Sequence, residues 1–127
     1  MKNVISTDLA PKAIGPYSQG IMVGDLIFLS GQIPVDPATG EIVTGDDPIV
    51  TQTHQSMNNV KNILESQGLS FNNVIKSTVF ITDMNDFPKV NEAYAQYFQG
   101  TYPARSCVQV GKLPKGALVE VEVVAHK

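Results

Sequence analysis

Two short segments near the C-terminal end of the chain carry side chains that could act on a small anionic molecule. Arg105 and Cys107 are two residues apart in the first segment, and Glu120 and Glu122 are two residues apart in the second. Because side chains alternate between the faces of a β-strand, each pair shares one face of its strand. Arginine binds a carboxylate through two parallel hydrogen bonds, and a partly desolvated glutamate can accept a proton from water. If the polar faces of the two strands align, these residues predict a site that hydrolyses a small anionic substrate without a metal.

The same four residues also fit a strand face that only contacts solvent. Cross-strand Arg–Glu pairs are common and stabilise a sheet by about 0.2–1 kcal/mol. A cysteine, however, is seldom an exposed strand residue, and Tyr17 and Tyr94 supply further polar groups elsewhere in the chain. The residues alone therefore leave the solvated face and the hydrolytic site as alternatives.

Other reactive residues give weaker signals. His54 and His126 have no acidic or cysteine residues at the spacing of a metal site. For a histidine such as His54, a packed or surface position is more common than a catalytic role. Ser18 does not lie in the G-x-S-x-G pattern of a serine hydrolase. Cys107 has no base close to it in the sequence, and no glycine-rich phosphate loop or dinucleotide fingerprint is present. The residues thus indicate neither a metal nor a nucleotide cofactor.

The composition is that of an ordinary globular protein. The chain has 127 residues, of which 43% are hydrophobic and 17% charged, and its net charge is -3. This length predicts one domain over residues 1–127, and the negative charge argues against binding to nucleic acid or an anionic membrane. The single cysteine excludes an intramolecular disulfide. The first residues lack the apolar stretch of a signal peptide, so we expect a cytoplasmic protein.

Glycine, proline and hydrophobic spacing divide the chain into expected elements. A helix should begin after Asp47, a capping residue followed by Pro48, and should end at Gly68. A second helix should run from Asp86 to Gly100. The expected strands cover residues 2–5, 21–23, 26–29, 74–82, 105–110 and 118–125.

This order of elements predicts an α+β fold with one mixed sheet. A strand–helix–strand unit implies parallel strands. The 24–25 turn and the 111–117 link are short enough to join antiparallel neighbours, so we expect a hairpin near each end of the chain. Two helices then pack on one face of the sheet. The opposite face stays uncovered, so it must be polar or buried against another subunit.

A series of short motifs runs through the whole chain. They are Ala13–Gly20, Ser30–Pro34, Thr78–Ile81, Asp83–Phe87, Val90–Asn91, Pro103–Val108 and Val119–Glu122. Each motif alone is a weak signal, but in this order they closely resemble the Rid family, the reactive intermediate deaminases also called the YjgF or L-PSP family. Within that family the sequence is most similar to the RidA subgroup.

The resemblance implies a fold, an assembly and a reaction. The implied fold is a chorismate-mutase-like α+β domain, with two helices on one face of a mixed sheet, that assembles as a homotrimer. Active sites would then lie in the clefts between subunits. The implied reaction is hydrolysis of small 2-imino acids or their enamine tautomers, such as 2-iminobutanoate and 2-iminopropanoate, to 2-oxo acids and ammonia. The family uses no cofactor for this reaction.

The resemblance also implies roles for individual residues. Arg105 matches the arginine that binds the substrate carboxylate, and Glu120 matches the acid that activates water. Tyr17 matches a pocket tyrosine that reaches in from the adjacent subunit. Cys107 matches a cysteine that lines the pocket without forming a covalent intermediate. Further residues expected near the ligand are Ser30, Gly31, Phe87 and Asn91.

Two other classes of function remain as alternatives. An Arg105 pocket that binds a 2-oxo acid without chemistry would make a regulatory or chaperone-like binding protein. Endoribonuclease or translation-inhibitor activity has also been assigned within the family. The acidic composition and the lack of a basic patch with interleaved aromatic residues argue against that second alternative.

Overall fold

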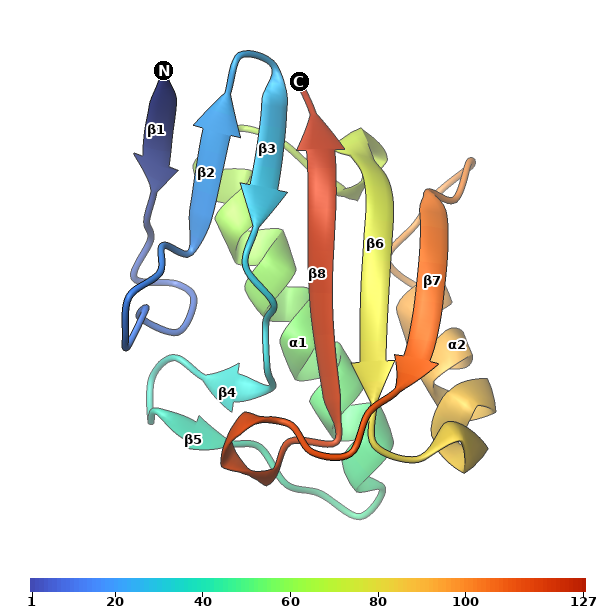
Figure 1. The fold of residues 1–127 in the computed structure, drawn as a ribbon. Coiled ribbons are helices and arrows are strands. Elements are labelled where there is room, and N and C mark those ends of the chain that lie inside the picture. Colours follow the sequence, from blue (N-terminus) through green and yellow to red (C-terminus); the bar gives the residue numbers. More distant parts are fainter.

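Six strands form one mixed sheet in the computed structural model, which describes all residues 1–127. Across the sheet they run β1 (Lys2–Ile5), β2 (Gly20–Val23), β3 (Leu26–Leu29), β8 (Val119–His126), β6 (Val74–Ile81) and β7 (Ala104–Gln109) (Figure 1). Only the β6–β7 pair is parallel. A small separate ribbon pairs β4 (Val35–Asp36) with β5 (Glu41–Ile42).

The first helix, α1 (Pro48–Ser66), confirms the expected boundaries. Pro48 occupies its first position, and Gly68 follows its end with a φ of 72°, a left-handed conformation that glycine adopts without strain. The cap itself differs from the prediction. The side chain of Asp47 makes no capping hydrogen bond, because its carboxylate pairs with Nζ of Lys89 at 3.0 Å.

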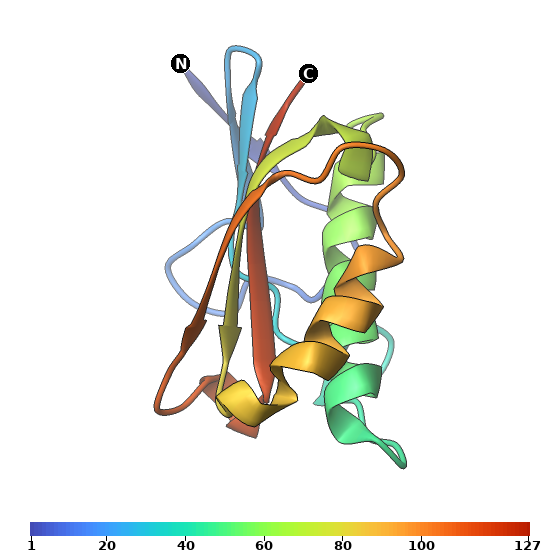
Figure 2. The ribbon, with the colours of Figure 1, turned by 90° about the vertical axis from the view of Figure 1, so that its right-hand side faces the viewer.

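The second helix, α2 (Phe87–Ala95), connects β6 to β7 and is shorter than predicted. Its apolar face continues past its end, since Phe98 is buried together with Val90 and Tyr94. A strand–helix–strand unit with parallel strands was predicted for this region, and the parallel β6–β7 pair confirms it. Both helices lie on the same side of the sheet (Figure 2).

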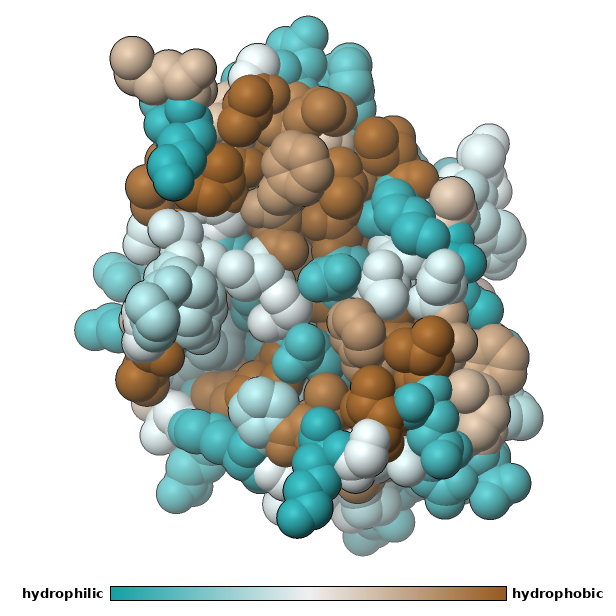
Figure 3. All heavy atoms as spheres, in the orientation of Figure 1, coloured by the Kyte–Doolittle hydropathy of each residue, from teal (hydrophilic) through white to brown (hydrophobic).

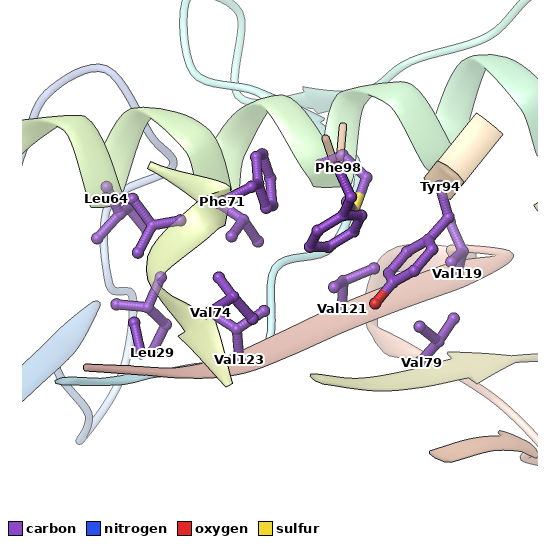
Figure 4. Packing of buried hydrophobic residues seen from close by; sticks show 14 of the residues in the cluster. Leu29, Leu64, Phe71, Val74, Val79, Tyr94, Phe98, Val119, Val121 and Val123 are labelled. Carbon is purple, nitrogen blue, oxygen red and sulfur yellow. The ribbon is translucent and has the colours of Figure 1, made fainter. Parts of the chain in front are cut away.

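The core lies between the helices and the sheet. Alternate residues of β8 are buried and face the helices, as the regular valine spacing predicts. Figure 4 shows the rings of Tyr94 and Phe98 pointing toward valines of this strand. The buried side chains of α1 complete this layer; they are Ile49, Gln52, Thr53, Ser56, Met57, Asn59, Val60, Ile63 and Leu64.

The predicted hairpin between the last two strands is wrong. β7 pairs only with β6, and β8 lies between β3 and β6, antiparallel to both. The 111–117 link therefore steps past the end of β6 instead of turning back on β7, and it includes the short η3 turn (Pro114–Gly116) (Figure 1). The core-facing valines of β8 explain the central position, because a central strand buries one face along its full length.

The sheet face opposite the helices is uncovered, as predicted, and part of it is apolar. Exposed hydrophobic side chains on this face include Val4, Val23, Leu26 and Phe28. Figure 3 shows hydrophobic residues gathered over the upper parts of β2, β3 and β8. A contiguous exposed apolar area of this kind typically marks an interaction surface. None of the helices is both long enough and apolar enough to cross a membrane.

Candidate active site in two halves

Arg105 lies on β7, on the sheet face that carries α2. Its Nη1 donates a hydrogen bond to Oδ1 of Asn91 at 2.7 Å. Its Cζ lies 5.3 Å from the ring centroid of Phe87 and 5.0 Å from that of Tyr94. Phe87, Asn91 and Tyr94 follow one another on α2 at spacings of four and then three residues, so all three lie on one face of the helix. We call this cluster of Arg105, Phe87, Asn91 and Tyr94 the arginine half of the site.

A pocket opens beside the arginine half. Its volume is about 430 Å³, and its lining residues are Asn91, Tyr94, Ala95, Tyr102, Pro103 and Arg105. A guanidinium at the wall of a pocket with aromatic neighbours is suited to binding a carboxylate, because it is a rigid and permanently charged donor. Sequence reasoning missed Tyr102, noted Pro103 only as part of a motif, and noted Tyr94 only as a polar group. Tyr94 shares a face of the predicted second helix with Phe87 and Asn91, and that spacing could have predicted its contact with Arg105.

Cys107 follows Arg105 on the same face of β7 and is half-buried against the core. Burial raises the pKa of its thiol, and the nearby positive charge of Arg105 opposes that rise only in part. The thiol is therefore protonated at neutral pH. Because the thiolate is the nucleophilic form, the structure gives no support to covalent chemistry at this cysteine.

Glu120 lies at the centre of the sheet, on β8, and points to the face without helices. Its carboxylate lies directly against Gly31, where even a methyl side chain would collide with it. Burial, and second the negative charge of Glu122, raise the pKa of Glu120 above its ordinary value. A carboxylate with a raised pKa is a stronger proton acceptor, which suits a general base.

Gly31 also lines a second pocket, of about 400 Å³, together with Tyr17, Ile33 and Lys115. The ring of Tyr17 is 51% exposed on the loop that precedes β2. Ser30 steadies this loop, since its hydroxyl donates to the carbonyl oxygen of Ser18 at 2.5 Å. We call Glu120, Gly31 and Tyr17 the glutamate half of the site.

The two halves lie on opposite faces of the sheet, which corrects the prediction that the polar faces of the last two strands align. Arg105 is paired with Ser77 of β6, and Glu120 is paired with Phe80 of the same strand. Paired residues share a face, and Ser77 and Phe80 are an odd number of positions apart, so their partners face opposite ways. One copy of the chain therefore does not bring Arg105 and Glu120 to the same small molecule.

The weaker sequence candidates stay outside both halves. Nδ1 of His54 lies 2.8 Å from the hydroxyl of Tyr97, so this histidine has a packing partner. His126 is exposed at the end of β8. No group of three or more histidine, cysteine, aspartate or glutamate side chains is arranged to hold a metal ion.

Proteins related to this chain align with nearly its whole length. The sequence profile described as Endoribonuclease L-PSP matches residues 7–127. A 2-iminobutanoate/2-iminopropanoate deaminase of Mus musculus is 49% identical over 125 residues, which are 98% of this chain and 91% of the mouse protein.

Solved structures confirm the mixed α+β fold. The crystal structure of E. coli TdcF with bound serine superposes with a TM-score of 0.92 at 51% identity, covering 98% of each chain. A protein of the conserved Rid family, YyfA of Yersinia pestis, superposes with a TM-score of 0.95 at 48% identity, covering all of both chains.

Proposed function

The chain belongs to the Endoribonuclease L-PSP family, which includes the Rid proteins, and from this premise we propose that it deaminates small 2-imino acids by hydrolysis. The products are a 2-oxo acid and ammonia. The observation that carries the proposal is the Arg105 guanidinium, which is fixed by Asn91 and two aromatic rings at the wall of a pocket. Such a cation selects a substrate with a carboxylate, as every 2-imino acid has.

The second part of the proposal is that two copies of the chain complete each active site in a homotrimer. The arginine half and the glutamate half lie on opposite faces of one sheet, so one small substrate cannot meet both in a single copy. The exposed apolar area around Phe28 supplies a surface that association would bury. Arg105 and Asn91 of one copy would then face Glu120, Gly31 and Tyr17 of the next.

In the proposed reaction Arg105 binds the carboxylate and orients the imine carbon toward a water molecule at Glu120. The Glu120 carboxylate removes a proton from the water as the water oxygen bonds to this carbon, and the C=N electron pair moves to nitrogen, which takes up a proton from solvent. In the resulting carbinolamine, the protonated Glu120 gives its proton to the amine nitrogen. The C–N bond then breaks as C=O forms, the hydroxyl proton passes to solvent, and ammonia is released. A positioned general base of this kind accelerates a reaction by about 10²–10⁴-fold.

The remaining site residues have supporting roles in this proposal. Tyr17 orients the water or the leaving nitrogen from the glutamate half. Cys107 lies two residues from Arg105 on the same face of β7, outside the set of residues that line the pocket, and acts there as a protonated thiol, in keeping with its raised pKa. Gly31 leaves the space that the Glu120 carboxylate occupies, and Ser30 holds the loop that carries Tyr17.

A coupled assay tests the proposed activity. Threonine dehydratase supplies 2-iminobutanoate from threonine or 2-aminoacrylate from serine, and semicarbazide traps the imine that survives. The wild-type chain should speed formation of the 2-oxo acid, and Arg105→Ala should not. Saturable binding of 2-oxobutanoate without turnover would instead support the regulatory binding protein, and RNA cleavage that survives Arg105→Ala would support the endoribonuclease.

A further inference from the structure

We propose that Tyr94 and Ser77 form a positioning pair that fixes the Arg105 guanidinium so that its edge, and not its face, meets the substrate carboxylate. The inference rests on the proposed function, because it assigns the source of carboxylate selectivity in the same site. Neither residue is a catalytic residue, since both act through Arg105.

The guanidinium contacts the faces of two aromatic rings that come from one helix. Cζ of Arg105 lies over both rings, 5.3 Å from the ring centroid of Phe87 and 5.0 Å from that of Tyr94. Aromatic rings attract a cation through their faces. A guanidinium held over ring faces in this way offers a ligand its in-plane N–H groups.

The position of the Tyr94 ring is itself fixed by Ser77. The two hydroxyl oxygens are 2.6 Å apart, and the side chains are 4% and 0% exposed. The surroundings are apolar, since the ring packs at 4.8 Å from Phe98 and points toward Val79 and Val121 (Figure 4). A buried hydroxyl is costly without a partner, so the two groups hold each other in one place.

The register of the sheet connects this pair to Arg105. Ser77 on β6 is the residue paired with Arg105 on β7. The hydroxyl contact therefore ties the Tyr94 ring, which lies against the guanidinium, to Ser77, the residue next to Arg105 across the sheet. Asn91 occupies one N–H group on Nη1. The free edge that remains can bind a carboxylate through two parallel hydrogen bonds, which is the strong geometry for this pair.

Steady-state kinetics and calorimetry on three variants test the pair. Tyr94→Leu removes the ring and should raise KM about tenfold, the effect expected for losing one desolvated cation–π contact. Ser77→Ala/Tyr94→Phe keeps the ring but removes both hydroxyls together, and should raise KM about threefold with stability close to wild type. In each variant kcat should stay within about twofold. Tyr97→Phe is the matched control, because its hydroxyl contacts His54 and not Arg105, and it should leave KM unchanged.

The double variant separates positioning from simple packing. If the hydroxyls serve only the fold, removing both leaves KM at its wild-type value, and that result overturns the inference. The dissociation constant of 2-oxobutanoate, measured by calorimetry, should rise in parallel with KM and needs no turnover. Equal dissociation constants for wild type and Tyr94→Leu also overturn the inference. Tight binding that weakens in the variants without any wild-type turnover overturns the proposed function and leaves the positioning pair supported.

Discussion

The two halves of the candidate site differ in how complete each is within one copy of the chain. Arg105 has its partners in place, with a hydrogen bond to Asn91 and rings from Phe87 and Tyr94. Glu120 has no cation beside it, since the single ion pair of the chain joins Lys89 and Asp47 on the surface. The arginine half is therefore preorganised by its own fold, whereas the glutamate half has no charged partner within one copy. Under the proposed function, association and not folding alone would bring the two halves together.

The largest expected effect comes from the glutamate half. Glu120→Gln keeps the size of the side chain but cannot accept a proton, so kcat should fall by about 10²–10⁴-fold. Binding of 2-oxobutanoate, measured by calorimetry, should remain, because the arginine half is unchanged. Glu122→Gln is the matched control on the same strand face, and its kcat should stay within about threefold of wild type. A Glu120→Gln protein with wild-type turnover would falsify the assignment of the base.

The arginine half should show the opposite pattern, with binding lost first. Arg105→Ala should lower kcat/KM by about 10²–10³-fold, the range for removing one partner of a hydrogen-bonded charge pair. Arg105→Lys keeps the charge without the planar fork and should recover only part of the loss. Circular dichroism and sedimentation would check that both variants fold and assemble as the wild type does. Retained binding of 2-oxobutanoate by Arg105→Ala would show that the carboxylate binds elsewhere.

Gly31 tests how closely the glutamate half is packed. Gly31→Ala places a methyl group against the Glu120 carboxylate. The carboxylate is the end of a side chain and can move aside, so kcat should fall about tenfold as the base leaves its position. Gly111→Ala is the control, because a side chain there meets open space. If both variants match the wild type in kcat, the Glu120 carboxylate does not need its present position.

The smallest expected effect is a shift in pH dependence. Burial and the charge of Glu122 raise the pKa of Glu120, and the base must be ionised to work. The rate kcat should therefore fall as pH drops through a value above that of an ordinary glutamate. Glu122→Gln removes the second cause, so its acid limb should move to lower pH by part of the total shift. An acid limb that does not move in Glu122→Gln assigns that limb to another group.

Local sequence signals predicted the elements that carry the site. Pro48 and Gly68 bracket the first helix as predicted, and the alternation of valine and glutamate in residues 119–123 correctly separates a core face from an uncovered face. These signals act over a few residues, so they can be read without tertiary information. The family motifs extended the prediction to Phe87 and Asn91, which the structure places beside Arg105.

The relation between the two halves could not be read in the same way. A link such as 111–117 is long enough to turn a hairpin or to step past one strand, and only the packing of the whole sheet decides between these paths. The strand that intervenes is β6, and its register sets Arg105 and Glu120 on opposite faces. Local alternation shows which side chains share a strand face but not which faces of different strands coincide.

Mixing two inactive variants tests most directly whether each site is shared between copies. Arg105→Ala and Glu120→Gln chains, unfolded together in equal amounts and refolded, form mixed assemblies. If each site takes its arginine from one copy and its glutamate from the next, about a quarter of the sites receive both intact residues by random mixing. The mixture should then regain about a quarter of the wild-type activity, while each variant refolded alone stays inactive. A mixture as inactive as its components, with mixed assemblies demonstrated by native mass spectrometry, would contradict a site shared between copies.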